Sequence, residues 1–348
     1  MEYRTVGRTG VKVSSLCLGT MTFGDNADEA ESGRIFEACL EAGVNFIDTA
    51  DVYSGGVSEE IVGRLIAGRR DDLVIVTKVF GRTAAGVNGG GSSRRHIVRA
   101  VEASLRRLNT DRLDYYLLHQ FDDSVALEET LHALDDLVRR GLVLYVGASN
   151  FAAWQYMKAL GISEREGLER FSLIQPMYNL VKRQAEVEIL PLALSERLGV
   201  ISFSPLAAGL LTGRYRDAHR DPHRDPHRDP QGDAHRGSHA TQGRLVENQR
   251  YKLRYGVPAY HQTSERFVDY AAEAGVNPVT LAVSWCASHP AVTAPIIGAS
   301  SLEQLLPSLA AAEHVMSAAM RAEISALSPE VPPAHDRREE EPARQARP

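Results

Sequence analysis

The sequence predicts an α/β protein that folds as a closed (β/α)8 TIM barrel with an N-terminal hairpin and a C-terminal helix. Short apolar runs alternate along the chain with longer segments whose apolar residues recur three or four positions apart, as expected for strands and packed helices. Eight such units follow one another. A doubly wound sheet shows the same alternation, but eight consecutive units favour a sheet that closes into a barrel.

The elements of this barrel can be given in chain order. Residues 2–13 predict a small hairpin at the bottom of the barrel. The predicted strands are 14–20, 45–50, 72–78, 113–119, 142–150, 171–179, 200–206 and 292–298. The predicted helices are 28–43, 58–68, 93–109, 126–140, 151–160, 185–198 and 301–312. The helix over 93–109 has Ser92 or Ser93 as a candidate N-cap, because a serine hydroxyl accepts a hydrogen bond from an amide of the first turn.

Two stretches interrupt the alternation. Residues 216–244 contain a tandem repeat that reads AHRD, PHRD, PHRD, PQGD, AHRG, and residues 331–348 form a charged tail that contains prolines. Neither has enough apolar residues to bury a core, so we predict that both are disordered. The rest of residues 1–330 then forms a single barrel domain of ordinary size.

The repeat accounts for an excess of histidine. Five of the 12 histidines lie between His219 and His239, and the first three, four residues apart, would share one face of a helix. Pro222, Pro226 and Pro230 exclude that helix, because proline removes a backbone donor and clashes with the preceding turn. We therefore predict no metal site.

Composition and charge exclude several classes of protein. The chain has 39 basic and 45 acidic residues, and no basic stripe interleaved with aromatic residues, which argues against a nucleic-acid partner. No apolar run is long enough to cross a membrane, and the start does not resemble a secretion signal. The cysteines (Cys17, Cys39 and Cys286) are scattered without metal-binding or disulfide spacing. We expect a soluble, cytoplasmic protein.

Titratable side chains end three consecutive predicted strands. Asp48 lies on the second strand, Lys78 on the third and His119 on the fourth, and Tyr53 follows Asp48 in the next loop. Reactive side chains of such barrels lie at the carboxyl ends of the strands, so we expect these four to converge at one rim.

The chemistry of the four residues is complementary. We expect the Lys78 ammonium to stabilise the tyrosinate and so to lower the pKa of Tyr53, which would make the phenol a usable proton donor. Asp48 would keep Lys78 charged and in place. His119 would hydrogen-bond the oxygen of a bound carbonyl.

At these residues the sequence resembles the aldo-keto reductases, from about residue 2 to residue 325. The segments 42-AGVNFIDTADVY-53 and 58-SEEIVG-63 look like the family's signature. The resemblance implies a catalytic tetrad of Asp48, Tyr53, Lys78 and His119. The branch that looks most similar is that of bacterial reductases related to the β subunits of voltage-gated potassium channels.

The resemblance also implies NADP(H) as the cofactor and assigns residues to each part of it. Gly298 and Ser300 are expected to open a helix whose amides favour phosphate. Relatives usually have asparagine where this chain has Ser308, and often lysine at Leu142. The implied contacts to the carboxamide are Ser149, Asn150 and Gln175, and the implied contact to the nicotinamide ring is Phe203. Those to the pyrophosphate are Ser204, Leu206, Gly209 and Arg214, and those to the adenine end are Gly298, Ser300 and Gln304.

A second pattern points to a different class of reductase. Tyr178 and Lys182 have the Y-x-x-x-K spacing of short-chain dehydrogenases, which requires a helix to bring both side chains to one face. Pro176 and the apolar residues around it predict a strand instead, so we reject this interpretation.

The function that follows is an NADPH-dependent reductase of a small-molecule aldehyde or ketone. One alternative is a reductase of a nucleotide-linked keto-deoxysugar in the secondary metabolism of a bacterium, suggested by the high alanine and arginine content and by relatives that look close. The other, from a different class, is a redox-sensing regulatory subunit that binds NADP(H) and turns over slowly. The sequence leaves the substrate and the formation of a homo-oligomer open.

Overall fold

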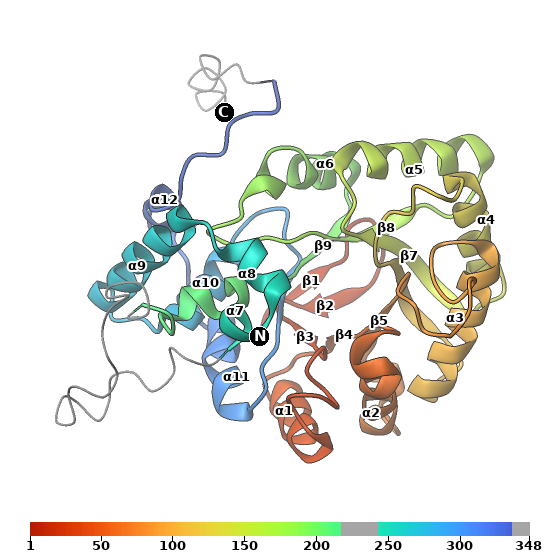
Figure 1. Cartoon of the computed structure of the whole chain (residues 1–348), viewed down its shortest axis with the longest axis horizontal. Coiled ribbons are helices and arrows are strands. Elements are labelled where there is room, and N and C mark those ends of the chain that lie inside the picture. Colours follow the sequence, from red (N-terminus) through yellow and green to blue (C-terminus); the bar gives the residue numbers. More distant parts are fainter. Residues whose placement is uncertain (217–242, 336–348) are drawn as a thin grey trace.

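The computed structural model describes residues 1–216 and 243–335. Its centre is a closed barrel of eight parallel strands, surrounded by helices (Figure 1). The predicted closed barrel with a hairpin is therefore confirmed. Most of the predicted disordered insert (217–242) and of the tail (336–348) lies outside the described residues. The predicted insert, 216–244, includes one residue too many at its C-terminal end, because helix α7 (Arg244–Glu247) begins at Arg244.

The strands follow one another around the barrel in chain order. The last strand closes it by pairing with the first, Ile296 opposite Cys17, and with its predecessor, Ala294 opposite Ile201. The strands are β3 (Cys17–Gly19), β4 (Phe46–Asp48), β5 (Val74–Val79), β6 (Leu113–Leu118), β7 (Val143–Ser149), β8 (Phe171–Gln175), β9 (Gly199–Ser202) and β10 (Ala294–Ile297).

The N-terminal hairpin closes the amino-terminal end of the barrel. Its strands β1 (Tyr3–Thr5) and β2 (Lys12–Ser14) pair antiparallel. Val6 and Val13 are fully buried and belong to the core cluster inside the barrel. A Cβ atom at Gly199 would lie 2.3 Å from Cγ1 of Val6, so the hairpin packs directly against the start of β9.

The predicted helices are present, with several changes at their ends. Ser93 is the N-cap of α3, where its hydroxyl accepts from the His96 amide at 3.3 Å. The predicted 151–160 helix was too short and continues to Glu166, and the 185–198 helix begins only at Ile189, after a 3-10 turn. The helices that cover the barrel are α1 (Glu29–Glu41), α2 (Val57–Leu65), α3 (Arg94–Leu108), α4 (Leu127–Arg139), α5 (Ala153–Glu166), α6 (Ile189–Glu196), α10 (Pro278–Ala287) and α11 (Leu302–Leu309).

Among the described residues, four helices between β9 and β10 were not predicted, and α7 and α10 are two of them. The other two are α8 (Gln249–Tyr255) and α9 (Pro258–Glu273). The C-terminal helix α12 (Ala318–Ala326) is the predicted one, and it lies beside α9, where Tyr270 donates to Glu323 at 2.7 Å (Figure 1).

A buried polar network attaches α12 to the barrel. Arg321 donates to the hydroxyls of Tyr178 (2.9 Å) and Ser288 (2.8 Å), and its guanidinium lies 4.7 Å from the centre of the Trp285 ring. Tyr178 in turn donates to Glu186 at 2.5 Å. The strand predicted over 171–179 was too long, since β8 ends at Gln175. Tyr178 and Lys182 lie in the irregular segment that follows.

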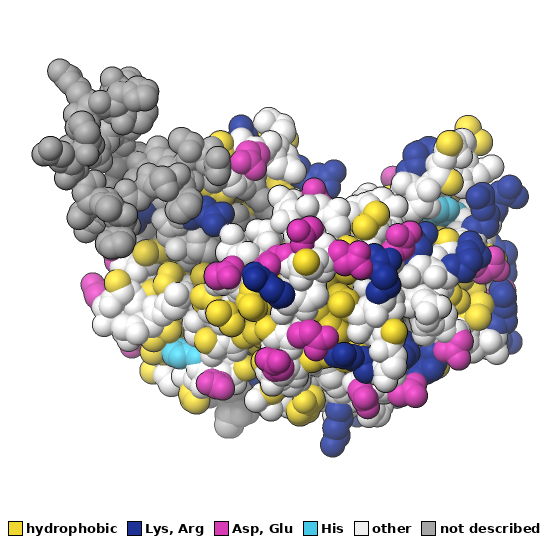
Figure 2. Space-filling model, turned by 90° about the horizontal axis from the view of Figure 1, so that it is seen from below, with side chains coloured by type: hydrophobic (Ala, Val, Ile, Leu, Met, Phe, Trp, Pro, Cys, Tyr) yellow, Lys and Arg dark blue, Asp and Glu magenta, His cyan; other side chains and the backbone are white. Residues whose placement is uncertain are grey.

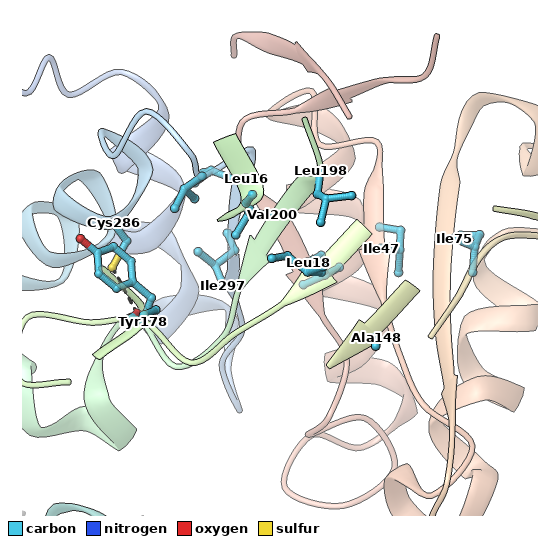
Figure 3. Close-up of a cluster of buried hydrophobic side chains, with 14 of the residues drawn as sticks. Leu16, Leu18, Ile47, Ile75, Ala148, Tyr178, Leu198, Val200, Cys286 and Ile297 are labelled. Atoms are coloured by element: carbon cyan, nitrogen blue, oxygen red, sulfur yellow. Dashed lines mark hydrogen bonds between the residues drawn. The ribbon is translucent and has the colours of Figure 1, made fainter. Parts of the chain in front are cut away.

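Two apolar clusters form the core. One fills the inside of the barrel with residues such as Phe46, Tyr115 and Leu173. The other lies between the barrel and the helices, and Figure 3 shows part of it, with Leu18 and Ile47 on neighbouring strands. The three cysteines are buried thiols; that of Cys286 donates to the Tyr178 carbonyl at 3.5 Å (Figure 3).

Charges of both signs are interspersed on the face shown in Figure 2, and basic side chains are denser at its right-hand edge. Pairs such as Arg94 with Asp136, at 2.6 Å, join side chains that are about half exposed. Pairs of this kind contribute little stability, about 0–1 kcal/mol each. The described residues include no helix that is long and apolar enough to span a bilayer.

Gly147 tests the packing of the barrel. A Cβ atom there would lie 1.9 Å from the carbonyl oxygen of Leu173 on the neighbouring strand, and the register shifts between Val146 and Gly147. We expect Gly147→Ala to lower the free energy of unfolding by about 1–3 kcal/mol or more, because the backbone has to move. Urea denaturation measures this.

The matched control is Gly161→Ala on the exposed side of α5. A Cβ atom at Gly161 meets nothing within 4 Å, so this change should stabilise the protein by about 0.5–1 kcal/mol. Equal stability of Gly147→Ala and the parent protein would contradict the packing argument.

Candidate active site

The carboxyl ends of β4, β5 and β6 bring the predicted tetrad together. Asp48 is the last residue of β4 and pairs with Val76 on β5. Lys78 lies two residues further along β5, and His119 follows the last residue of β6, with its amide donating to the Val79 carbonyl at 2.9 Å. Parallel register therefore places the three side chains at one end of the barrel.

Tyr53 reaches the same place from the turn after β4. It begins a 3-10 turn, η1 (Tyr53–Gly56), in which Ser54 and the two glycines have positive φ angles of 48°, 65° and 102°. The left-handed region favours glycine, which explains the GG pair in the sequence. The Tyr53 ring lies 5.9 Å from the His119 ring, centre to centre, in an edge-to-face arrangement.

Lys78 is the centre of the group and is fully buried. Its ammonium donates to Asp48 at 2.8 Å, to the carbonyl of Thr49 at 2.6 Å and to the Tyr53 hydroxyl oxygen at 3.3 Å. Because Lys78 donates to this oxygen, the hydroxyl hydrogen of Tyr53 remains available to another acceptor.

Burial and charge act on the Lys78–Asp48 pair in opposite directions. Burial raises the pKa of the Asp48 carboxyl, although Lys78 and a hydrogen bond from Gln175 oppose the shift. Burial alone would lower the pKa of Lys78, but the contacts with Asp48 and Tyr53 outweigh it, so the pKa lies above its ordinary value. Lys78 is thus held as a cation although its side chain is fully buried.

The expected lowering of the pKa of Tyr53 is not found. Burial raises the pKa of the phenol above its ordinary value; Lys78 opposes this shift, and Asp48 adds to it. The sequence could not indicate how completely water is excluded. Tyr53 is therefore protonated throughout the physiological range, and Lys78 stabilises its anion only as a proton leaves.

His119 is neutral in this environment. Burial and, second, the charge of Lys78 lower the pKa of its imidazole to about 3. A neutral imidazole can donate one hydrogen bond and accept another, which suits contact with an uncharged oxygen.

The three residues expected at the carboxamide lie next to the tetrad. Gln175 donates to Asp48 Oδ1 at 2.8 Å, and the Ser149 hydroxyl donates to the Gln175 carbonyl at 2.9 Å. Asn150, with a φ of 58°, donates to the Ser149 hydroxyl at 3.0 Å and to the His119 carbonyl at 2.9 Å. The sheet thus gathers residues from β7 and β8 around Asp48.

The residues expected at the ring and the pyrophosphate line the carboxyl end of β9. Phe203 follows β9 and is half-buried, and Ser204 has a φ of 59°. Asn179 donates to the Ser204 carbonyl at 2.9 Å and so supports this loop. Leu206 and Gly209 (φ 91°) flank a turn with three consecutive positive φ angles, and Arg214 follows it, exposed. Successive amides in such turns form concavities that bind anions.

The prediction that Gly298 and Ser300 begin the helix is wrong by one residue. Ser301 is the N-cap of α11, and the Ser300 hydroxyl instead donates to the Gln304 side chain at 3.0 Å. Gly298 directly follows β10, and a Cβ atom there would lie 2.9 Å from the Gly19 carbonyl oxygen. All three positions remain beside the start of α11.

An acidic side chain occupies that helix start, which the sequence did not indicate. Glu31 of α1 accepts from the Leu302 amide at 2.6 Å, and Arg34 pairs with Glu31 at 2.6 Å. Glu31 is far from Leu302 in sequence, so no local pattern could have revealed the contact.

Helix α8 adds a second feature that the sequence did not show. Tyr255 lies with its hydroxyl 3.3 Å from the Asn179 side chain and donates to the Met177 sulfur at 3.6 Å. One turn earlier, Tyr251 acts electrostatically on Tyr53 and adds to the rise of the Tyr53 pKa that burial causes. This short helix follows α7, in a region where the sequence shows no strand–helix pattern.

This chain forms a (β/α)8 barrel, and titratable side chains gather at the carboxyl ends of its strands. That is the architecture of the TIM-barrel enzymes. The chain belongs to the aldo/keto reductase family, whose profile matches residues 15–329. The family generally uses NAD(P)H.

Several relatives cover most of this chain. The uncharacterized oxidoreductase YrpG of Bacillus subtilis is 36% identical over 325 residues, 90% of this chain and 91% of that protein. A probable voltage-gated potassium channel subunit beta of Arabidopsis thaliana is 36% identical over 321 residues, 90% and 92% of the two chains. The versiconal hemiacetal acetate reductase of Aspergillus parasiticus is 31% identical over 336 residues, 88% and 90% of the chains. Family and relatives support an oxidoreductase that acts on carbonyl groups.

Proposed function

We propose that this protein reduces a small-molecule aldehyde or ketone to an alcohol, with NADPH as the reductant. The observation that carries the proposal is the buried Lys78, which contacts both Asp48 and the oxygen of Tyr53. A buried cation beside a neutral phenol favours transfer of the phenolic proton to an oxygen that is gaining negative charge.

The side chains divide the work. The neutral His119 donates a hydrogen bond to the carbonyl oxygen and orients it, and Tyr53 donates its proton to that oxygen as the carbon–oxygen double bond becomes single. Lys78 stabilises the resulting tyrosinate, and Asp48 fixes Lys78. Water then returns a proton to Tyr53. The nicotinamide, when bound, supplies the hydride to the carbonyl carbon.

The residues present fit a nicotinamide cofactor. The amide and hydroxyl groups of Ser149, Asn150 and Gln175 can pair with a carboxamide, and they lie beside the tetrad. Phe203 supplies an aromatic side chain that would contact the nicotinamide ring. The backbone amides of the Ser204–Gly209 loop would bind the pyrophosphate. Arg214, Gly298, Ser300 and Gln304 would serve the phosphates and the adenine.

The proposal is tested by NADPH consumption with a panel of aldehydes, ketones and keto-sugars. We expect turnover with at least one carbonyl class and stoichiometric alcohol formation. A protein that binds NADPH but oxidises it with no member of the panel would contradict the proposal.

A second candidate function is a redox-sensing subunit that exchanges its cofactor slowly. The similarity to a probable channel β subunit favours it. Stopped-flow kinetics separates the two functions. Rapid hydride transfer in a single turnover, followed by no further turnover, indicates the sensor, whereas equal single-turnover and steady-state rates indicate the enzyme.

Glu31 provides a test of cofactor preference. Its carboxylate lies at the start of α11, and a phosphate bound nearby would be repelled by it. We expect Glu31→Gln to tighten NADPH binding several-fold while NADH binding changes little. Titrations by quenching of protein fluorescence measure both affinities, and Glu102→Gln, at an exposed acid on α3, is the control. An equal gain in affinity for NADPH and NADH would contradict the placement of the additional phosphate of NADPH at the start of α11.

A further inference from the structure

A group of buried polar side chains lies behind the candidate site, between the barrel and helices α2 and α3. We call it the acid cluster; Asp51 is 1% exposed, and Glu59, Thr77 and Tyr116 are fully buried. Arg107 of α3 completes it. Glu59 comes from α2, Thr77 from β5 and Tyr116 from β6, and Asp51 lies in the turn after β4. None of these residues belongs to the tetrad.

The charges in the acid cluster do not balance. Glu59 accepts from the Thr77 hydroxyl at 2.5 Å and from Arg107 Nε at 2.7 Å, and Arg107 Nη2 lies 2.6 Å from the same carboxylate. Lys78 is held by Asp48. Within the part of the chain that the structure describes, both of these cations thus contact other acids, and neither forms an ion pair with the second acid, Asp51.

Asp51 has no hydrogen-bond partner for either side-chain oxygen within residues 1–216 and 243–335, nor has the Tyr116 hydroxyl. A buried, ionised carboxylate without a partner is costly, whereas the neutral acid costs much less. Burial first, and then the charge of Glu59, raises the pKa of Asp51 to about 7; Arg107, Lys78 and, least of the three, the backbone amide of Val52 oppose this shift. Asp51 therefore gains its charge only as the pH rises through neutrality.

The acid cluster touches the turn that carries Tyr53 from two sides. The Asp51 amide donates to the Lys78 carbonyl at 3.3 Å, and the Tyr53 amide donates to the Ala50 carbonyl at 3.1 Å. On the other side, a Cβ atom at Gly56 would lie 3.0 Å from Cδ of Arg107. The backbone of Asp51 and the side chain of Arg107 therefore adjoin the turn on two sides.

We propose that Asp51 is a positioning residue for Tyr53: as a neutral acid it keeps the turn in place, and once ionised beside Glu59 it displaces the turn. The proposal rests on the proposed function in that Tyr53 is the proton donor. Four groups face Asp51. They are the Glu59 carboxylate, the Lys78 ammonium, the Arg107 guanidinium and the Tyr116 hydroxyl, and burial raises the pKa of Tyr116 well above its ordinary value.

The expected consequence is a hydride-transfer rate that falls as pH rises through about 7. A misplacement of Tyr53 by less than 1 Å is enough to slow the step by about 10- to 100-fold. The pKa of His119 is about 3, so titration of this imidazole does not account for a fall near neutral pH.

The test is the pH profile of the single-turnover rate on both sides of pH 7. Asparagine resembles the neutral acid in shape and cannot ionise, so Asp51→Asn should keep the rate of low pH and remove the fall at high pH. Glu59→Gln removes the charge that an ionised Asp51 would meet and leaves Arg107 without its carboxylate partner, so the fall at high pH should become much smaller. Asp136→Asn, an exposed acid on α4, should leave the profile of the parent protein.

Two results would overturn the proposal. One is an unchanged fall in Asp51→Asn. The other is a slow Asp51→Asn at every pH with normal cofactor binding, since the site would then need an ionised carboxylate.

An infrared pH titration of the parent protein does not depend on activity or on folding of the variant. We expect the carbonyl band of a protonated carboxyl to disappear as pH rises through about 7, and to be missing in Asp51→Asn. Absence of the band in the parent protein overturns this proposal alone. A titrating band in a protein that reduces no carbonyl supports the neutral acid and overturns the proposed function instead.

Discussion

Tyr53→Phe is expected to abolish most of the hydride transfer while leaving the fold and cofactor binding intact. Phenylalanine keeps the ring and its contact with His119, and removes only the hydroxyl that lies 3.3 Å from Lys78. Loss of a general acid costs about 10²- to 10⁴-fold in rate. Single-turnover stopped-flow kinetics with saturating NADPH measures the step directly.

Two measurements make this result specific. Cofactor affinity should stay within about twofold of the parent value, because Tyr53 is not one of the proposed cofactor contacts. The buried Tyr255→Phe serves as a matched control for loss of a phenolic hydroxyl elsewhere on the rim and should retain transfer. Full activity of Tyr53→Phe would remove Tyr53 from the mechanism.

Lys78→Met is expected to lose both activity and stability. It leaves Asp48, which is 3% exposed, without its cation, and breaking a buried ion pair in this way costs about 3–5 kcal/mol. Asp48 in the variant takes up a proton more readily in the folded than in the unfolded state. The variant should therefore be most stable at low pH and lose stability as pH rises above about 4.

The double variant Lys78→Met with Asp48→Asn separates the two losses. It removes the unpaired charge, so urea denaturation should show most of the stability restored and the pH dependence gone. Hydride transfer should stay absent, because no cation stabilises the Tyr53 anion. Recovery of activity in the double variant, or equal stability of both variants at all pH values, would contradict the role given to Lys78.

The closed barrel and the positions of the tetrad follow from local sequence pattern. Alternating apolar runs set the strands, and residues that end such runs in a parallel barrel must lie at one rim. Asp48, Lys78 and His119 could therefore be named together, and the short loop to Tyr53 left little freedom. The motifs around them carried the same information independently.

Element ends and the region after β9 depended on contacts that the local pattern does not contain. Helix α5 continues to Glu166 although its pattern weakens, and α8 and α9 follow the repeat without a strand between them. Ser301 rather than Ser300 caps α11, a choice between adjacent serines that the local pattern does not decide.

The sequence by itself determined the fold, the family resemblance and the identity of four candidate catalytic side chains, because these depend on periodicity and on residue type at strand ends. Tertiary structure alone decided their electrostatics. Burial outweighs the charge of Lys78 and raises the pKa of Tyr53. The packing of distant segments brings Glu31 to the start of α11 and leaves the side chain of Asp51 without a hydrogen-bond partner beside Glu59. Solvent exclusion and long-range contacts set these properties, and both arise only when distant segments pack against one another.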